Sequence, residues 1–133
     1  MSRRTLREQL FKLLFRVEFN DVEEMQEQCE FFFDDIDNPI DEKDMELIQK
    51  KFDLIMDKLS EIDEQINEKA KGWSVDRMAK VDLTIIRLAV YEILHDEDVP
   101  TGVAINEAVE LAKKFGQDES YSFVNGVLAR FAA

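Results

Sequence analysis

Residues 83–90 read LTIIRLAV, and this stretch decides the fold. It contains a single charged residue, Arg87, so a helix built from it is apolar on almost every side. A helix of this kind usually lies in the centre of a protein, with other helices packed around it. We therefore expect a helix over residues 81–95 to form the middle of the structure.

Helical periodicity continues on both sides of this stretch, and no segment alternates apolar and polar residues as a strand does. Apolar residues recur at three- and four-residue steps in residues 4–19, 21–35, 41–59, 60–71, 103–115 and 120–131. The sequence therefore predicts an all-α fold of about seven helices, with a short helical turn at residues 73–78. The whole chain, 1–133, is expected to form one domain with a seam at Gly72–Trp73, giving helical bundles at 1–71 and 72–133.

Individual residues predict where these helices begin, end and face the core. Ser60 is expected to cap the fourth helix, Gly72 to end it, Gly116 to end the sixth, and residues 96–102 to form a loop. The predicted buried side of the second helix comprises Val22, Met25, Cys29, Phe32 and Phe33.

The charge of the chain is unevenly distributed. The net charge is −13, which by itself disfavours nucleic acid. Residues 1–19 nevertheless carry five basic residues against two acidic ones, whereas residues 20–68 carry four basic against 18 acidic. Only the first segment and parts of the last third could attract phosphates.

The residues that enzymes and metal sites need are scarce. The chain has one histidine, His95, and one cysteine, Cys29, so it can form neither a Cys/His metal cluster nor an internal disulfide. Its four glycines are isolated, so they form no phosphate-binding loop. No run of about 18 apolar residues could cross a membrane. We expect a cytoplasmic protein that is not an enzyme and uses no cofactor or metal.

Five segments in the last 50 residues carry a resemblance to a known family. They are residues 86–92 (IRLAVYE), 99–100 (VP), 103–113 (VAINEAVELAK), 115–116 (FG) and 123–128 (FVNGVL). In order and spacing they resemble the signature of the NusB family. Near the start, Arg7-Glu8 followed by Leu14-Phe15 resembles the basic first helix of that family.

The resemblance implies a fold of two packed three-helix bundles and a role in transcription antitermination. It implies binding of boxA-type single-stranded RNA together with NusE, a ribosomal small-subunit protein. The partners would include the RNA polymerase elongation complex with other Nus factors, acting chiefly on ribosomal RNA operons.

Single-stranded RNA is bound by cations that contact phosphates and by flat side chains that stack on bases. Arg3 and Arg7 are one helical turn apart, whereas Lys12 and Arg16 project to a different side. Taken with the resemblance, this chemistry predicts RNA-binding residues Arg3, Arg4, Arg7, Phe15, Phe123, Asn125 and Gly126. Phe15 replaces a tyrosine of the family and keeps its stacking face. Phe123 could equally belong to the core, and Gly126 could equally allow two helices to pack closely.

The resemblance places the NusE-binding surface on the central helix, at Asp82, Arg87, Tyr91 and Glu92. Asp82 could instead act at the start of the helix, where negative charge is favourable. Arg87 could pair within the fold, for example with an acid of residues 103–115. Two alternatives to the antitermination factor stay open: a protein-interaction module or homodimer that has lost RNA binding, and an accessory of an RNA-modifying enzyme.

Overall fold

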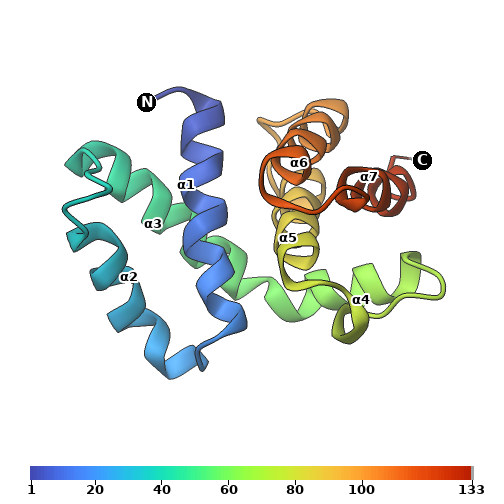
Figure 1. Cartoon of the computed structure of the whole chain (residues 1–133), viewed down its shortest axis with the longest axis horizontal. Coiled ribbons are helices and arrows are strands. Elements are labelled where there is room, and N and C mark those ends of the chain that lie inside the picture. Colours follow the sequence, from blue (N-terminus) through green and yellow to red (C-terminus); the bar gives the residue numbers. More distant parts are fainter. Residues whose placement is uncertain (133) are drawn as a thin grey trace. The chain divides into compact units, whose positions relative to one another are not determined.

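The computed structural model describes residues 1–132, and in this part of the chain all regular secondary structure is helical (Figure 1). The seven α-helices are α1 (Arg3–Phe15), α2 (Met25–Asp34), α3 (Glu42–Asp57), α4 (Leu59–Lys69), α5 (Lys80–His95), α6 (Thr101–Phe115) and α7 (Ser120–Ala129). Three 3-10 helices complete the order: η1 (Arg16–Glu18), η2 (Val22–Glu24) and η3 (Val75–Arg77). The prediction of an all-α fold with about seven helices is confirmed. Within residues 1–132, no helix combines the length and the apolar character needed to cross a bilayer.

Contacts divide the chain into two compact units, Met1–Met56 and Asp57–Ala133. The first unit holds α1, α2 and nearly all of α3, and the second holds α4 to α7. Helix α4 belongs to the second unit because it packs against α5. The predicted seam at Gly72–Trp73 lies inside this second unit, between α4 and η3, and the division at that point stays a prediction.

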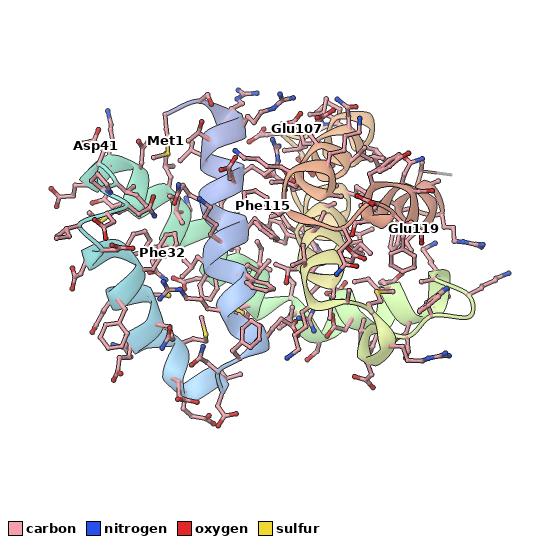
Figure 2. The ribbon with its side chains drawn as sticks, viewed as in Figure 1. Met1, Phe32, Asp41, Glu107, Phe115 and Glu119 are labelled. Atoms are coloured by element: carbon pink, nitrogen blue, oxygen red, sulfur yellow. The ribbon has the colours of Figure 1, made fainter. Side chains whose placement is uncertain are left out.

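In the first unit, polar contacts tie α1 to the segments that follow it. The Gln9 amide donates to Asn38 Oδ1 at 3.3 Å, and the Asn38 amide donates back to Gln9 Oε1 at 2.9 Å. At the other end, Arg16 Nη1 donates to the backbone carbonyl and to the side-chain oxygen of Gln28. The Arg16 guanidinium also lies 5.3 Å from the ring centroid of Phe32, which is labelled in Figure 2. Arg16 is therefore a structural residue that joins α1 to α2.

In the second unit, α5 is the central helix, and α4, α6 and α7 all contact it. Its side chains are buried in every direction, as the sequence predicts; the buried set comprises Asp82, Leu83, Thr84, Ile85, Ile86, Leu88, Ala89, Val90, Tyr91 and Glu92. Thr84 satisfies its hydroxyl within the helix by donating to the Lys80 carbonyl at 2.8 Å. Arg87 pairs with Asp63 of α4. The suggested pairing of Arg87 with an acid of residues 103–115 stays a prediction.

Several helix ends differ from the sequence predictions. Ser60 does not cap α4, because α4 already begins at Leu59. Lys58 is the N-cap residue and the single residue between α3 and α4. Helix α6 begins at Thr101 inside the predicted loop, because Pro100 takes the extended N-cap position, where proline's missing N–H costs nothing. Gly72 does follow the end of α4, with a φ of 86° that favours glycine.

Five residues are predicted to form the buried side of the second helix, and among them only Val22 is exposed to solvent. It is 71% exposed, whereas Met25, Cys29 and Phe32 are buried. The reason is that α2 begins only at Met25, and Val22 starts the preceding 3-10 helix η2. The α-helical periodicity that would place Val22 on the buried face therefore does not reach it.

Candidate functional site

The arginines predicted to bind RNA lie at the N-terminus of α1, in the first unit. Ser2 caps this helix, because its Oγ accepts a hydrogen bond from the backbone N–H of Thr5 at 3.1 Å. Arg3 and Arg4 are exposed, and Arg7 is half-buried. The first turn carries no acidic residue, so the positive end of the helix dipole adds to the arginine charges. This arrangement favours an anion at the start of α1.

The other two bases of the first segment serve contacts within the unit. Lys12 Nζ lies 3.8 Å from Glu8 Oε1, and Arg16 joins α1 to α2 as described above. The amino terminus is engaged as well, with the Met1 ammonium 3.6 Å from Asp44 Oδ2; Met1 is labelled in Figure 2. Arg4 and Arg7 make contacts within the structure as well. Phosphate binding by Arg3, Arg4 and Arg7 is therefore argued from their position at the start of α1.

Phe15 lies at the opposite end of α1 from these arginines. At 1.5 Å per residue, about 18 Å of helix separates it from Arg3. Its ring is part of a ridge, stacked on Phe11 at 6.1 Å and edge-on to Phe19 at 5.1 Å between centroids. Phe19 is 60% exposed, so the ridge offers an aromatic surface to solvent. The structure therefore does not join Phe15 and the arginines in one compact site.

In the second unit, Phe123 belongs to a small aromatic patch that we define as Trp73, Arg77 and Phe123. The Trp73 and Phe123 rings meet edge to face at 5.4 Å, and the Arg77 guanidinium lies 5.5 Å from the Trp73 ring centroid. Trp73 is 47% exposed and Phe123 is half-buried, so neither ring is sealed in the core. Exposed rings beside a guanidinium are suited to stacking on bases.

Trp73 and Arg77 are candidate residues that the sequence predictions missed. A signal for them was available, because Trp73 lies outside every helical apolar stripe, between Lys71-Gly72 and Ser74. An aromatic side chain outside the apolar stripes becomes informative when it forms an exposed patch with others, as Trp73 does with Phe123. Their proximity to Phe123, 50 positions away in sequence, becomes visible only in the folded unit.

Asn125 and Gly126 are both exposed on α7. A Cβ atom added to Gly126 would meet nothing within 4 Å. Close packing of two helices, one of the two explanations offered for this glycine, is therefore absent from the described structure. Gly116 is the contrasting case, because an added Cβ there would overlap the Ser120 side chain and the Ala112 carbonyl oxygen.

These two glycines give a matched prediction about stability. Gly126→Ala should raise the free energy of unfolding by about 1 kcal/mol, because alanine is the better helix former and the space is open. Gly116→Ala should lower it by about 1–3 kcal/mol through overpacking. Urea denaturation of both variants measures the two signs. Destabilisation by Gly126→Ala would contradict the open surroundings of that residue.

The residues predicted to bind NusE lie on α5 but are mostly covered. Asp82, Tyr91 and Glu92 are 8%, 6% and 4% exposed. The fourth residue, Arg87, is held by Asp63 of α4. Burial raises the pKa of the Tyr91 hydroxyl, and the nearby Asp96 and Glu92 carboxylates raise it further, so Tyr91 stays neutral. A partner protein could contact only the small exposed parts of Asp82, Tyr91 and Glu92.

Asp82 differs from the rest of the set in its hydrogen bonding. It lies in the first turn of α5, three residues after the N-cap Ala79, so it does not cap the helix. Among the described residues, its Oδ1 atom is one of two buried side-chain polar atoms without a hydrogen-bond partner. A buried carboxylate oxygen in this state is destabilising until a donor reaches it. An added donor that reaches Asp82 would therefore stabilise the start of α5.

The fold and these residues define a class of protein, small all-helical chains that expose basic and aromatic side chains. Residues 4–133 match the NusB family. The chain is 57% identical over 132 residues to the transcription antitermination protein NusB of Agathobacter rectalis, covering 99% of this chain and 100% of that protein. It is 41% identical to NusB of Clostridium botulinum, covering 96% of each. The chain belongs to the NusB family.

Solved structures agree with this assignment. The T. maritima NusB structure has a TM-score of 0.86 and 38% identity, covering 99% of this chain and 91% of that one. A second structure, of the antitermination factors NusB and NusE in complex with dsRNA, has a TM-score of 0.77 and 27% identity, covering 97% and 94%. Membership of a family of transcription antitermination proteins confirms the prediction that the chain is a regulator of transcription and not an enzyme.

Proposed function

We propose that this chain promotes antitermination by binding boxA-type single-stranded RNA jointly with NusE. It would act in the bacterial cytoplasm, within the RNA polymerase elongation complex and together with other Nus factors, chiefly on ribosomal RNA operons. The observation that carries the proposal is the likeness, over nearly the whole chain, to a structure of NusB and NusE in complex with dsRNA. This likeness supports binding of NusE and of RNA, and the single-stranded boxA form of the RNA is what the family resemblance implies.

The charges of the chain support a joint complex over RNA binding by the chain alone. An acidic protein with a net charge of −13 repels phosphates at long range. A basic partner would offset part of this field and add phosphate contacts of its own. It could also supply the donor that Asp82 Oδ1 lacks.

The residues predicted to contact RNA would bind different parts of it. Arg3, Arg4 and Arg7 would neutralise phosphates, and the aromatic patch would stack on bases. Gly126 has open space around it, so its missing side chain would allow a close approach of RNA to α7.

A gel-shift titration of a boxA-like single-stranded RNA, with and without NusE, tests the proposal. The pair should bind the RNA about 5–150-fold more tightly than this chain alone, and by linkage RNA should tighten the protein pair by the same factor. Trp73 is the single tryptophan, so quenching of its fluorescence would report a base at the aromatic patch. A double-stranded RNA of the same sequence shows whether unpaired bases are required.

Two outcomes would contradict the proposal. If NusE does not bind the chain, the proposed complex of this chain with NusE and RNA does not form, and the proposed function is wrong. If NusE binds and RNA adds nothing, the alternative of a protein-interaction module or homodimer, which the acidic charge favours, becomes the better description. An Asp82→Asn variant keeps the shape of the side chain, so loss of NusE binding in it would assign Asp82 to the partner surface.

A further inference from the structure

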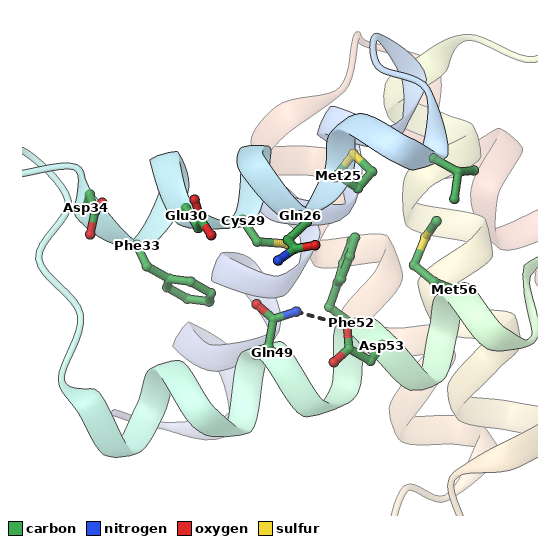
Figure 3. Close-up of a pocket in the computed structure, with 11 residues that line it drawn as sticks. Met25, Gln26, Cys29, Glu30, Phe33, Asp34, Gln49, Phe52, Asp53 and Met56 are labelled. Atoms are coloured by element: carbon green, nitrogen blue, oxygen red, sulfur yellow. Dashed lines mark hydrogen bonds between the residues drawn. The ribbon is translucent and has the colours of Figure 1, made fainter.

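A groove of about 710 Å³ opens between α2 and α3 in the first unit (Figure 3). Figure 3 shows side chains from the two helices pointing toward one another across it. It is lined by Val22, Met25, Gln26, Cys29, Glu30, Phe33, Asp34, Gln49, Phe52, Asp53 and Met56. None of the residues predicted to bind RNA or NusE is among them, so the groove is separate from the proposed function.

The floor of the groove is apolar and rich in sulfur and aromatic rings. Met25, Cys29 and Phe52 are buried in it, and Phe33 and Met56 are half-buried. Val22 stands at one end, 71% exposed. Methionine side chains are flexible and polarisable, and they are common on surfaces that bind varied apolar helices. The floor therefore suits the apolar face of a peptide.

The rim of the groove is acidic. Glu30, Asp34 and Asp53 line it and are exposed, and no lysine or arginine is among the lining residues. Gln49 Nε2 donates to Asp53 Oδ1 at 2.9 Å, which orients that carboxylate, drawn with its dashed line in Figure 3. The rim belongs to the segment with 18 acidic residues against four basic ones. Charge complementarity excludes RNA and favours a cationic ligand.

We propose that this groove binds a basic amphipathic helix of a protein partner. A helix satisfies its own backbone hydrogen bonds, and its apolar stripe can lie on a groove between two helices. Helix α2 has ten residues, about 15 Å, which matches about three turns of a partner helix. Lysines or arginines flanking the stripe would meet Glu30, Asp34 and Asp53.

The probe for the test is a synthetic amphipathic peptide of leucine and lysine residues, compared with the same peptide carrying glutamate in place of lysine. Fluorescence anisotropy of the labelled peptides should show saturable binding of the lysine form, about tenfold or more tighter than that of the glutamate form. Cys29 reports occupancy of the groove, because its alkylation should slow when the peptide covers it. We expect slow alkylation in the free protein as well, since burial raises the pKa of the Cys29 thiol.

Charge reversal on the rim separates this site from general attraction to an acidic protein. The triple variant Glu30→Lys, Asp34→Lys and Asp53→Lys should bind the lysine peptide about tenfold or more weakly. The control triple, Glu23→Lys, Glu27→Lys and Asp37→Lys, makes the same charge change at exposed residues outside the groove and should bind nearly as the parent does. Val22→Lys changes one exposed residue, so it should fold even if the rim triple does not, and it should also weaken binding.

Three results would overturn the proposal. They are a lack of saturable binding, equal losses in the rim and control triples, and dimerisation of the free chain that the rim triple abolishes. The last result would assign the groove to a second copy. None of these results depends on NusE, so failure here and failure of the proposed function are distinguishable.

Discussion

Replacing Asp63 with alanine should lower the free energy of unfolding by about 2–3 kcal/mol, close to a hundredfold in the unfolding equilibrium. Arg87 Nε donates to Asp63 Oδ1 and Nη2 donates to Oδ2, both at 2.9 Å, so the pair is bidentate. The two side chains are only 12% and 24% exposed. Removing the carboxylate would leave the guanidinium on the central helix, largely covered, without its α4 partner. The remaining exposure allows some water to reach it, which is why we expect less than the loss for a fully buried pair.

Chemical denaturation of the Asp63→Ala variant measures this effect. Glu64→Ala is the matched control, because Glu64 is the next residue of α4 and is exposed; its effect should stay within about 0.5 kcal/mol. An Asp63→Ala variant as stable as the parent would mean that the pair contributes little to joining α4 and α5.

Replacing Arg3, Arg4 and Arg7 together with alanine should flatten the salt dependence of RNA binding. If about four cations displace counterions from single-stranded RNA, log affinity falls with log salt at a slope of about −3, and the triple variant should show about −1. At about 0.1 M salt the same relation gives a loss of about 100-fold in affinity. Alanine favours helix, so α1 should persist in the variant.

A second triple variant controls for the loss of three positive charges. Lys50, Lys51 and Lys58 are exposed and are not among the residues predicted to bind RNA, so their replacement with alanine should leave the slope nearly unchanged. Filter binding at several salt concentrations gives both slopes. An unchanged slope in the arginine triple would move the phosphate-binding site away from α1.

The sequence predicts well what depends on neighbouring residues in the chain. The centrality of α5 follows from a stretch that is apolar in all directions, and the turn at Gly72 follows from the freedom of glycine. Helix ends are less predictable, because a change to 3-10 geometry, as at Val22, leaves the apolar spacing intact for a residue or two. The arginines of α1 could be predicted as a group, because one turn of helix holds them together.

Contacts between distant segments could not be predicted from spacing alone. Nothing local indicates that Arg87 pairs with Asp63 of α4, since several helices carry acidic residues. The meeting of Trp73 with Phe123 likewise depends on how α7 packs near η3. The apolar groove was hidden because its two walls, α2 and α3, each read as an ordinary amphipathic helix whose buried face is fully covered.

The packing of α4 to α7 also bears on how quickly this unit forms. Helix α5 contacts α4 and α6, its neighbours in the chain, and α7 contacts α6 and α5. The pairings of helices that are neighbours in the chain close only short loops, so little chain entropy is lost before those contacts are made, whereas the pairing of α5 with α7 spans α6. Helical topologies dominated by such local pairings fold in microseconds to milliseconds. The unit can therefore assemble soon after α7 leaves the ribosome, with the contacts of α7 on α5 and of Phe123 on Trp73 completing it.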